Sequence, residues 1–382
     1  MKILGIETSC DETAAAIVED GSKILSNVVV SQIDIFAEYG GVIPEVAARS
    51  HLEVMMPVVQ KALEDAKCTW SDIDAIAVTY APGLLGSLLI GTLTARTLAI
   101  LHDKPLYAVH HLKSHVYANW LEVEMPKNVH SRPSCEDASK KSEALPVTTG
   151  ERERVENGPF LTFPLLALVI SGGHTQILYM PAHNKFEIIG TTHDDAVGEC
   201  FDKVAKILGL PYPGGPSIAK AATNGDENKY KLPHPKVDNL DFSFSGLKTA
   251  VLRAVQKELG LPISHPSHDL KNHLSEQQVA DFAASFQKTA IDILLEKLEK
   301  AREQHPEVKS IVFAGGVSAN QKLREMAGHS LQKNLPVFFP EAKFSGDNGA
   351  MVAAAAYYEI QSGIEPTNPY KLNIYPRIEI TC

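Results

Sequence analysis

Apolar and polar positions follow the same order near the start of the chain and again near its middle. Residues 2–20, KILGIETSCDETAAAIVED, predict an apolar strand, a polar turn and a second strand. Residues 165–180, LLALVISGGHTQILYM, repeat this order around a turn of Ser and Gly. Backbone N–H groups and hydroxyls of such turns can bind an anion. Two hairpins of this kind indicate a duplicated α/β unit, although two ordinary hairpins with small turns would give the same pattern.

Between the predicted strands, apolar residues recur at helical spacing. Residues 43–66 start with Ile-Pro and then carry apolar side chains at helical spacing, and residues 279–305 form a second long amphipathic pattern. Residues 310–327 predict a strand, a glycine turn and a helix, and residues 337–363 predict a strand, a loop and an Ala-rich helix. Because strands and helices alternate, the predicted fold class is α/β.

Two segments stand out from this alternation. Residues 75–100 are the most apolar, but Pro82, several glycines and Arg96 interrupt them. They predict a strand, a loop and a buried helix rather than a membrane span. The stretch 122–159 is charged, contains Pro and has few apolar residues, so it cannot bury enough surface to fold alone. We therefore assign residues 121–160 to a flexible polar insertion between the two halves.

The chain has 382 residues, of which 44% are hydrophobic, and this is enough for two packed domains. Its net charge of −10 is unlike that of a protein that binds nucleic acid unaided, so a nucleic-acid substrate would need a local basic groove or a partner. Solubility alone is the simpler explanation of the charge. The start of the chain turns acidic within seven residues and does not resemble a signal peptide. The scattered cysteines, without a CxxC pair, suit a reducing cytosol: Cys10, Cys68, Cys135, Cys200 and Cys382.

The motif HHLKSH contains the first candidate metal ligands. His111 and His115 are four residues apart, so on a helix both imidazoles face the same side and can bind one metal ion. Spacing alone favours a chance pair, because the chain has 15 histidines. His110 lies on another face and is expected to be a hydrogen-bonding neighbour. A zinc peptidase of the HExxH type would have Glu where Leu112 stands, which argues against peptide hydrolysis.

Asp347, in SGDNGAMVAAA, is the candidate third ligand. It stands where a loop enters the Ala-rich helix, a position where a capping carboxylate is common, and the pattern alone favours that role. Two imidazoles and one carboxylate with open positions would suit non-haem Fe(II), with Zn(II) as the alternative.

Three glycine-rich turns, VISGGHT, YPGGPS and FAGGVSAN, allow the backbone to approach a ligand closely. Together they favour a nucleotide site, but none matches the dinucleotide or P-loop motifs. Asp202 and Lys203 lie in the first turns of a helix predicted within residues 194–210. An acid at the rim of a nucleotide pocket can accept hydrogen bonds from a ribose, and a solvated helix face is the alternative.

Seven stretches, taken in order along the chain, carry a resemblance to a known family: GIETSCDETAAAIV, SQIDIFAEYGGVIPEVAARSH, HHLKSHVYA, LVISGGHTQI, DDAVGECFDKVAKILGLPYPGGPSI, FAGGVSAN and FSGDNGAMVA. Together they resemble the TsaD family of bacterial tRNA N6-adenosine threonylcarbamoyltransferases. The resemblance covers nearly the whole chain except the insertion. It implies an actin-like, sugar-kinase-like (ASKHA) fold with two lobes around a central cleft. Residues 1–120 with 346–382 would form the first lobe, and residues 161–345 the second.

The resemblance also implies a division of roles among site residues. His111, His115 and Asp347 would hold one divalent metal, Fe(II) first and Zn(II) second. The phosphate and threonylcarbamoyl end of the donor would bind at Leu168, Val169, Ile170, Ser171, Gly172 and Gly173. The adenosine end would bind at Asp202, Gly215 and Asn320. The candidate bases are Asp11 and Glu12. In place of the acid and glycine usual in the family, this chain has Lys113 and Ser114.

The implied reaction transfers a threonylcarbamoyl group from L-threonylcarbamoyl-AMP to N6 of the adenosine after the anticodon in tRNAs that read ANN codons. The product is t6A and AMP is released. Implied partners are a TsaB-like paralogue, a TsaE-like ATPase, an upstream donor synthase and a second copy of the chain, in the cytoplasm and without a membrane. We expect the helix over 43–66 to contribute to a subunit surface, or else to the core. The alternatives are a metallopeptidase, an ATP-dependent kinase or ATPase, and a catalytically silent scaffold.

Overall fold

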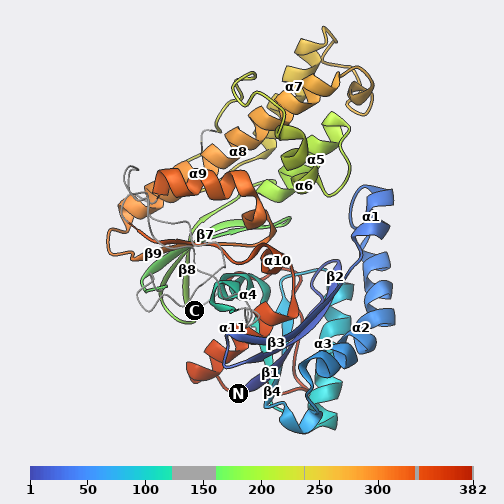
Figure 1. Ribbon diagram of the computed structural model, residues 1–382, viewed down its shortest axis with the longest axis vertical. Coiled ribbons are helices and arrows are strands. Elements are labelled where there is room, and N and C mark those ends of the chain that lie inside the picture. The colour runs from blue at the N-terminus through green and yellow to red at the C-terminus, as the bar shows by residue number, and fades with distance from the viewer. Residues whose placement is uncertain (123–160, 236, 332–334, 381–382) are drawn as a thin grey trace, which may run out of the picture.

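The computed structural model describes residues 1–122, 161–235, 237–331 and 335–380, which form two five-stranded sheets (Figure 1). The first sheet, in the order β3-β2-β1-β4-β5, consists of β1 (Lys2–Glu7), β2 (Glu12–Glu19), β3 (Lys23–Ser31), β4 (Ala75–Ala81) and β5 (Leu106–His110). The second sheet, in the order β10-β9-β6-β7-β8, consists of β6 (Leu165–Ile170), β7 (Thr175–Ala182), β8 (Lys185–Thr191), β9 (Ser310–Ala314) and β10 (Val337–Phe338).

The two sheets share one topology. In the first sheet β1, β2 and β3 form an antiparallel meander, and β4 and β5 extend the sheet in parallel from β1. In the second sheet β6, β7 and β8 form the meander, and β9 and β10 extend it in parallel from β6. The repeated order confirms the duplicated α/β unit that the two hairpin patterns predict.

Helices cover both outer faces and fill the space between the sheets. On the first sheet pack α2 (Pro44–Ala66) and α3 (Leu85–Leu101), and the short α1 (Ile33–Tyr39) precedes them. On the second sheet α8 (Glu276–Gln304) and α9 (Gln321–Leu331) contact the strands, and α5 (Val197–Leu208), α6 (Gly214–Ala222) and α7 (Ser245–Glu258) pack against α8. Two further helices, α4 (His111–Tyr117) and α11 (Gly349–Gln361), share a buried apolar cluster with strands of both sheets, and the short α10 is Ala342–Ser345.

The predicted helices agree closely with the observed ones. The pattern at 43–66 is α2, which begins at Pro44, and the pattern at 75–100 is β4 followed by α3. The pattern at 279–305 is α8, which begins earlier because Ser275 and Gln278 form a capping box. No helix in the described part of the chain is long and apolar enough to cross a membrane. The predicted insertion lies outside the described residues beyond Glu122, and the predicted lobe boundaries stay a prediction.

The layer between the sheets brings distant parts of the chain together. α4 contacts β4 and β5 of the first sheet and β6 and β9 of the second, while α11 packs on β1, β2 and α4. The approach of α11 to β1 is close, because a Cβ on Gly5 would lie 2.2 Å from the carbonyl oxygen of Gly349. Only glycine at position 5 fits this contact, and it fixes the start of α11 directly beside α4.

Candidate metal centre and cleft

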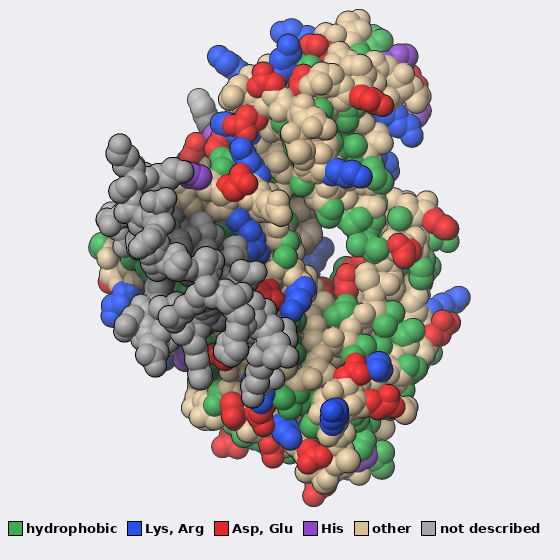
Figure 2. Space-filling view, viewed as in Figure 1, with side chains coloured by type: hydrophobic (Ala, Val, Ile, Leu, Met, Phe, Trp, Pro, Cys, Tyr) green, Lys and Arg blue, Asp and Glu red, His purple; other side chains and the backbone are tan. Residues whose placement is uncertain are grey.

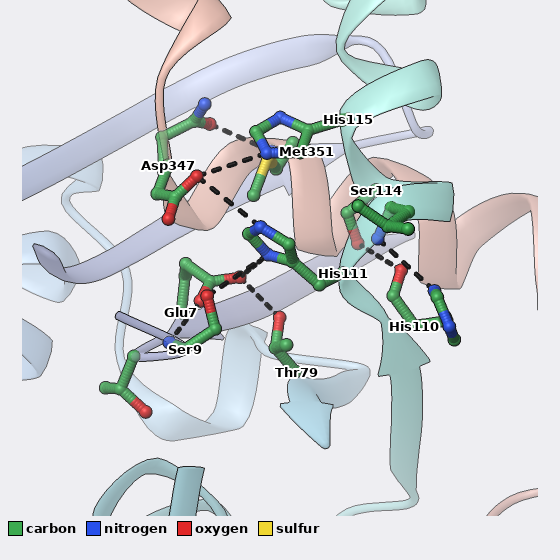
Figure 3. Close-up of polar contacts among 12 residues, drawn as sticks. Glu7, Ser9, Thr79, His110, His111, Ser114, His115, Asp347 and Met351 are labelled. Carbon is green, nitrogen blue, oxygen red and sulfur yellow. Dashed lines mark hydrogen bonds and ion pairs between the residues drawn. The ribbon is translucent and has the colours of Figure 1, made fainter. Parts of the chain in front are cut away.

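The two histidines of the HHLKSH motif lie on α4, immediately after β5 ends. His110 caps this helix: its Nδ1 accepts a hydrogen bond from the Leu112 N–H (3.3 Å), and its Nε2 lies 3.3 Å from the Ile378 carbonyl oxygen. Burial lowers the pKa of His110 to about 3, so it is neutral. It is the hydrogen-bonding neighbour that the sequence predicts. His111 and His115 then project from one side of α4, with their rings 4.6 Å apart (Figure 3).

Asp347 faces both imidazoles from the start of α11. Its Oδ1 lies 3.6 Å from Nε2 of His111 and 3.1 Å from Nε2 of His115 (Figure 3). The sequence pattern favours Asp347 as a helix cap, and this is wrong. The cap is Asn348, whose Oδ1 accepts a hydrogen bond from the Met351 N–H (3.0 Å). Because Asn348 takes the capping role, the Asp347 carboxylate is directed toward α4.

The charges of this cluster stabilise one another. Burial opposes the charging of His111, but the Asp347 and Glu7 carboxylates outweigh it and raise its pKa to about 9. Burial likewise opposes the ionisation of Asp347, but His111 and His115 outweigh it and lower its pKa to about 2. The site thus favours an anionic Asp347 with positive charge beside it.

Glu7, at the end of β1, is a site residue that sequence reasoning missed. It is fully buried, and its Oε2 lies 3.2 Å from Nδ1 of His111. The carboxylate also accepts hydrogen bonds from the Thr79 hydroxyl and the Ser9 N–H. A carboxylate on one ring nitrogen orients the other nitrogen toward its ligand. The only signal in the sequence is an acid at the end of an apolar strand, and the strand pattern alone gives it no role.

The three side chains fit a divalent transition metal. One donor atom from each of His111, His115 and Asp347 lies within 4.8 Å of the others. Both ring nitrogens of His115 are buried: Nδ1 has no hydrogen-bond partner among the described residues, and Nε2 has the Asp347 carboxylate oxygen as its charged neighbour at 3.1 Å. A cation bound by Nε2 and this carboxylate would give both of them a partner. Two imidazoles and one carboxylate leave coordination positions open.

A cleft of about 1800 Å³ opens beside this cluster, and Figure 2 shows the molecule hollowed between its upper and lower parts. Its walls include most of the residues that the sequence analysis singles out: Asp11, Glu12, His111, Ser171, Gly172, Gly173, Asp202, Gly215, Asn320 and Asp347. Four others are buried away from the cleft surface: His115, behind His111, and Leu168, Val169 and Ile170, inside β6. The side chains of these three strand residues form core rather than cleft wall.

The cleft wall also contains residues that the sequence analysis did not select. His174 follows the SGG turn, and burial together with nearby His111 lowers its pKa to about 4, so it is neutral. Arg377, near the chain's end, adds an exposed cation to the same wall. Neither residue is marked by a spacing pattern, and only the fold places them beside the cleft.

The turn after β6 and the start of α6 are open to a ligand. No atom lies within 4 Å of where a Cβ would sit on Gly172, Gly173 or Gly215. Asp202 is held by its Oδ1, which accepts the Gly214 N–H (2.6 Å), and Asn320 caps α9 by accepting the Leu323 N–H (3.1 Å). These positions give the cleft bare backbone beside fixed polar side chains.

The first hairpin turn is held from α2. Nε2 of His51 lies 2.9 Å from the Cys10 carbonyl oxygen, and its Nδ1 lies 2.7 Å from the Thr13 hydroxyl. This contact fixes the backbone on either side of Asp11 and Glu12. Burial, then the nearby Asp347 and Asp11, raise the pKa of Glu12 well above its ordinary value. A carboxylate with a raised pKa is a stronger proton acceptor.

The residues in place of the family's acid and glycine do not disturb the donors. Ser114 is buried and donates a hydrogen bond to the His110 carbonyl oxygen (3.3 Å). The Lys113 ammonium lies 5.3 Å from the ring centroid of Phe186, so this side chain is directed at Phe186. Leu112 is 2% exposed and belongs to the apolar core, so position 112 offers no general base for peptide hydrolysis.

Comparison with known proteins gives one consistent result. The family model described as TsaD, tRNA N6-adenosine threonylcarbamoyltransferase, matches residues 23–133 and 148–354. A relative of that name from Caldicellulosiruptor bescii is 44% identical over 382 residues, covering 100% of this chain and 98% of its own. Another from Symbiobacterium thermophilum is 44% identical and covers 95% of this chain and 92% of its own.

Among solved structures, HypF from T. kodakarensis superposes with a TM-score of 0.55 at 15% identity, covering 95% of this chain and 48% of that one. At that identity the likeness speaks only for the fold. Together with the family match and the two sheets of one topology, it confirms the ASKHA fold class.

Proposed function

This chain belongs to the TsaD family and is a tRNA N6-adenosine threonylcarbamoyltransferase that forms t6A, and we propose that the cleft beside His111 and Asp347 is the site of transfer. The donor is L-threonylcarbamoyl-AMP, and the acceptor is the adenosine after the anticodon in tRNAs that read ANN codons. The observation that carries the proposal is the convergence of His111, His115 and Asp347 on one side of this cleft.

His111, His115 and Asp347 would hold one divalent metal ion, Fe(II) in preference to Zn(II), because two imidazoles and a carboxylate with open positions suit that ion. Bound there, the ion would supply Lewis-acid polarisation of donor oxygens. Glu7 holds the His111 ring so that Nε2 is directed toward Asp347. The chain's own contribution at this point is therefore a fixed, buried set of three donors.

The remaining residues of the cleft bind and orient the donor. The bare backbone of Gly172 and Gly173 can direct N–H groups at the phosphate and at the carbonyl oxygen, where negative charge develops during transfer, while the Ser171 N–H closes the turn on the His174 carbonyl oxygen (2.9 Å). Asp202, Gly215 and Asn320, which line the same cleft, suit the adenosine end, where the Asp202 carboxylate can accept from ribose hydroxyls. The buried strand residues Leu168 to Ile170 support this turn from behind.

Proton removal from N6 falls to the first hairpin turn. N6 is a weak nucleophile because its lone pair is delocalised into the ring, so a base beside it assists attack on the activated carbonyl. Asp11 and Glu12 both line the cleft, and the pKa of Glu12 is raised by burial. We assign the base to this pair.

A second subunit is expected on the face formed by α2 and α3. Leu52 and Met56 on α2 are 69% and 50% exposed, and Leu89 and Leu93 on α3 are each 44% exposed. Apolar side chains gathered on one surface are typical of protein interfaces. We propose that a TsaB-like paralogue covers this face, with a second copy of the chain as the alternative, and that a TsaE-like ATPase acts with the pair. A tRNA substrate makes the cytoplasm the expected compartment.

The proposal is tested by reconstitution. The purified chain is combined with donor synthase, threonine, bicarbonate, ATP and unmodified tRNA, with and without the two partners, and t6A is measured by nucleoside mass spectrometry. His111→Ala and His115→Ala should abolish t6A, while His234→Ala, at an exposed histidine paired with Glu296, should not. Full transfer by folded His111→Ala and His115→Ala variants would remove this cluster from the reaction. Peptide cleavage in place of transfer would favour the metallopeptidase alternative.

A further inference from the structure

A second group of side chains that could bind a metal lies outside the cleft, in the segment that joins α7 to α8. His265, Asp269 and His273 each offer one donor atom, and these three atoms lie within 4.8 Å of one another. In Figure 1, α7 lies at the top of the view, whereas α4, which carries His111 and His115, lies near the centre. The proposed transfer reaction makes no use of this group.

The local fold directs both imidazoles at the same oxygen atom. Nε2 of His265 lies 2.9 Å from Oδ2 of Asp269, and Nε2 of His273 lies 3.1 Å from that same atom. The two rings are 5.8 Å apart and nearly perpendicular. Between Asp269 and His273 the chain makes one 3-10 turn, Leu270–Asn272, anchored by the fully buried Leu270. The turn therefore has a fixed position, while its polar side chains face outward.

The carboxylate of this group is prepared to act as a ligand. Its other oxygen, Oδ1, accepts a hydrogen bond from the Asn272 side-chain amide (2.9 Å), which orients the group. Hydrogen bonds from Asn272 and His273 lower the pKa of Asp269 to about 2, so it is ionised at neutral pH. Each histidine presents Nε2, the nitrogen that already faces the carboxylate.

The donor set selects among metal ions. Two imidazoles and one carboxylate are typical zinc ligands, whereas Ca²⁺ and Mg²⁺ prefer oxygen alone. In a tetrahedral zinc site with bonds of about 2.0–2.1 Å, neighbouring donors are roughly 3.4 Å apart. The observed separations of 2.9 and 3.1 Å must therefore open by a few tenths of an ångström. This is a small movement, since the side chains of His265, Asp269 and His273 are 20%, 38% and 47% exposed.

We propose that His265, Asp269 and His273 form a surface zinc site that is independent of the cleft. Three protein ligands leave one tetrahedral position open, for water or for a donor group of another molecule. Because the ligands span residues 265–273, the ion would link the middle of the segment to the turn before α8. Zinc would then stabilise the folded form of this segment in proportion to its binding.

Zinc titration tests the proposal, with competition against a chromophoric chelator as the readout. The double variant His111→Ala, His115→Ala removes the cleft donors, so the remaining zinc reports the surface site alone. We expect one zinc ion per chain with micromolar affinity. Adding His265→Ala or His273→Gln should weaken this binding at least about tenfold. The matched control is His268→Ala, at an exposed histidine of the same segment.

Three outcomes would overturn the proposal. One is a double variant that retains its fold by circular dichroism but binds no zinc, which would leave a hydrogen-bonded cluster without a metal. Another is an equal loss of zinc in the His268→Ala control. The last is unchanged zinc binding in His273→Gln. The His273 side chain is about half exposed, so this substitution should leave the fold intact and its zinc affinity reports the site itself. His273→Gln in the otherwise native chain should retain t6A formation, so failure of this proposal and failure of the proposed function are separable.

Discussion

Replacing Glu359 with Gln should stabilise the protein at neutral and alkaline pH. Glu359 lies on α11, is 6% exposed, and has its pKa raised to about 7 by burial, which the nearby Lys113 ammonium only partly offsets. Its charge also acts on its neighbours, since burial and then Glu359 raise the pKa of Tyr80. A carboxylate in this environment resists ionisation, and the glutamine amide has nearly the same shape without the charge.

The sign follows from where the proton is held. Between pH 4.5, the ordinary value, and pH 7, the folded protein keeps the Glu359 proton while the unfolded chain releases it. The free energy of unfolding therefore falls as pH rises through this window, and it levels off above the folded pKa. Each pKa unit corresponds to about 1.4 kcal/mol, so the full loss is about 3 kcal/mol. The side-chain amide introduced by Glu359→Gln does not titrate, so the variant avoids this loss.

Urea unfolding followed by circular dichroism at pH 5, 6, 7 and 8 measures the effect. The stability difference between Glu359→Gln and the native chain should be small at pH 5 and reach about 3 kcal/mol at pH 8. The matched control is Glu303→Gln, at an exposed position near the end of α8, and its stability difference from the native chain should not change with pH. If the stability difference between Glu359→Gln and the native chain does not change with pH, or if the variant is less stable at pH 8, the inference that burial raises the pKa of Glu359 is refuted.

Two further predictions concern the metal centre and the subunit surface. Glu7→Gln should retain the fold, because its amide oxygen can still accept from the Ser9 N–H and its amide N–H group can donate to the Thr79 hydroxyl. The variant should nevertheless weaken metal binding at the cleft by about 10–100-fold in chelator competition, and an unchanged affinity would remove Glu7 from the orientation of His111. Leu52→Glu with Met56→Glu should change stability by less than about 0.5 kcal/mol but abolish co-elution with the TsaB-like paralogue. Light scattering measures the same assembly, with Ile263→Glu as the control at an exposed position. Unaltered assembly of the Leu52→Glu, Met56→Glu variant would exclude the α2 surface.

Elements of the fold were predictable where periodicity and local signals agree. The residues 43–66 are an example, since Pro at the first helical position and apolar spacing both define α2. The capping box of α8 was also readable, as Ser275 and Gln278, but the apolar pattern begins after it and placed the start at 279. Periodicity marks where a helix becomes amphipathic, whereas the cap marks where it begins.

The candidate site was predictable only in part, because side-chain direction depends on tertiary contacts. Asp347 and Asn348 are both good capping residues, and sequence alone does not tell which of the two turns away from the helix. Burial inside β6 separates Leu168 to Ile170 from the turn that follows them, although a motif presents the run as one unit. Glu7 has no motif signal of its own, since its role comes from the strand position that faces His111.

The position of the candidate metal centre follows from the central layer of the fold. His111 and His115 come from the helix after β5, and Asp347 comes from the start of the helix that packs on β1. These segments are more than two hundred residues apart, and they meet because Gly5 lets the start of α11 touch the sheet. A larger side chain at Gly5 would displace Gly349 and with it Asp347. The chemistry of the cleft therefore depends on a backbone contact that contains no functional group.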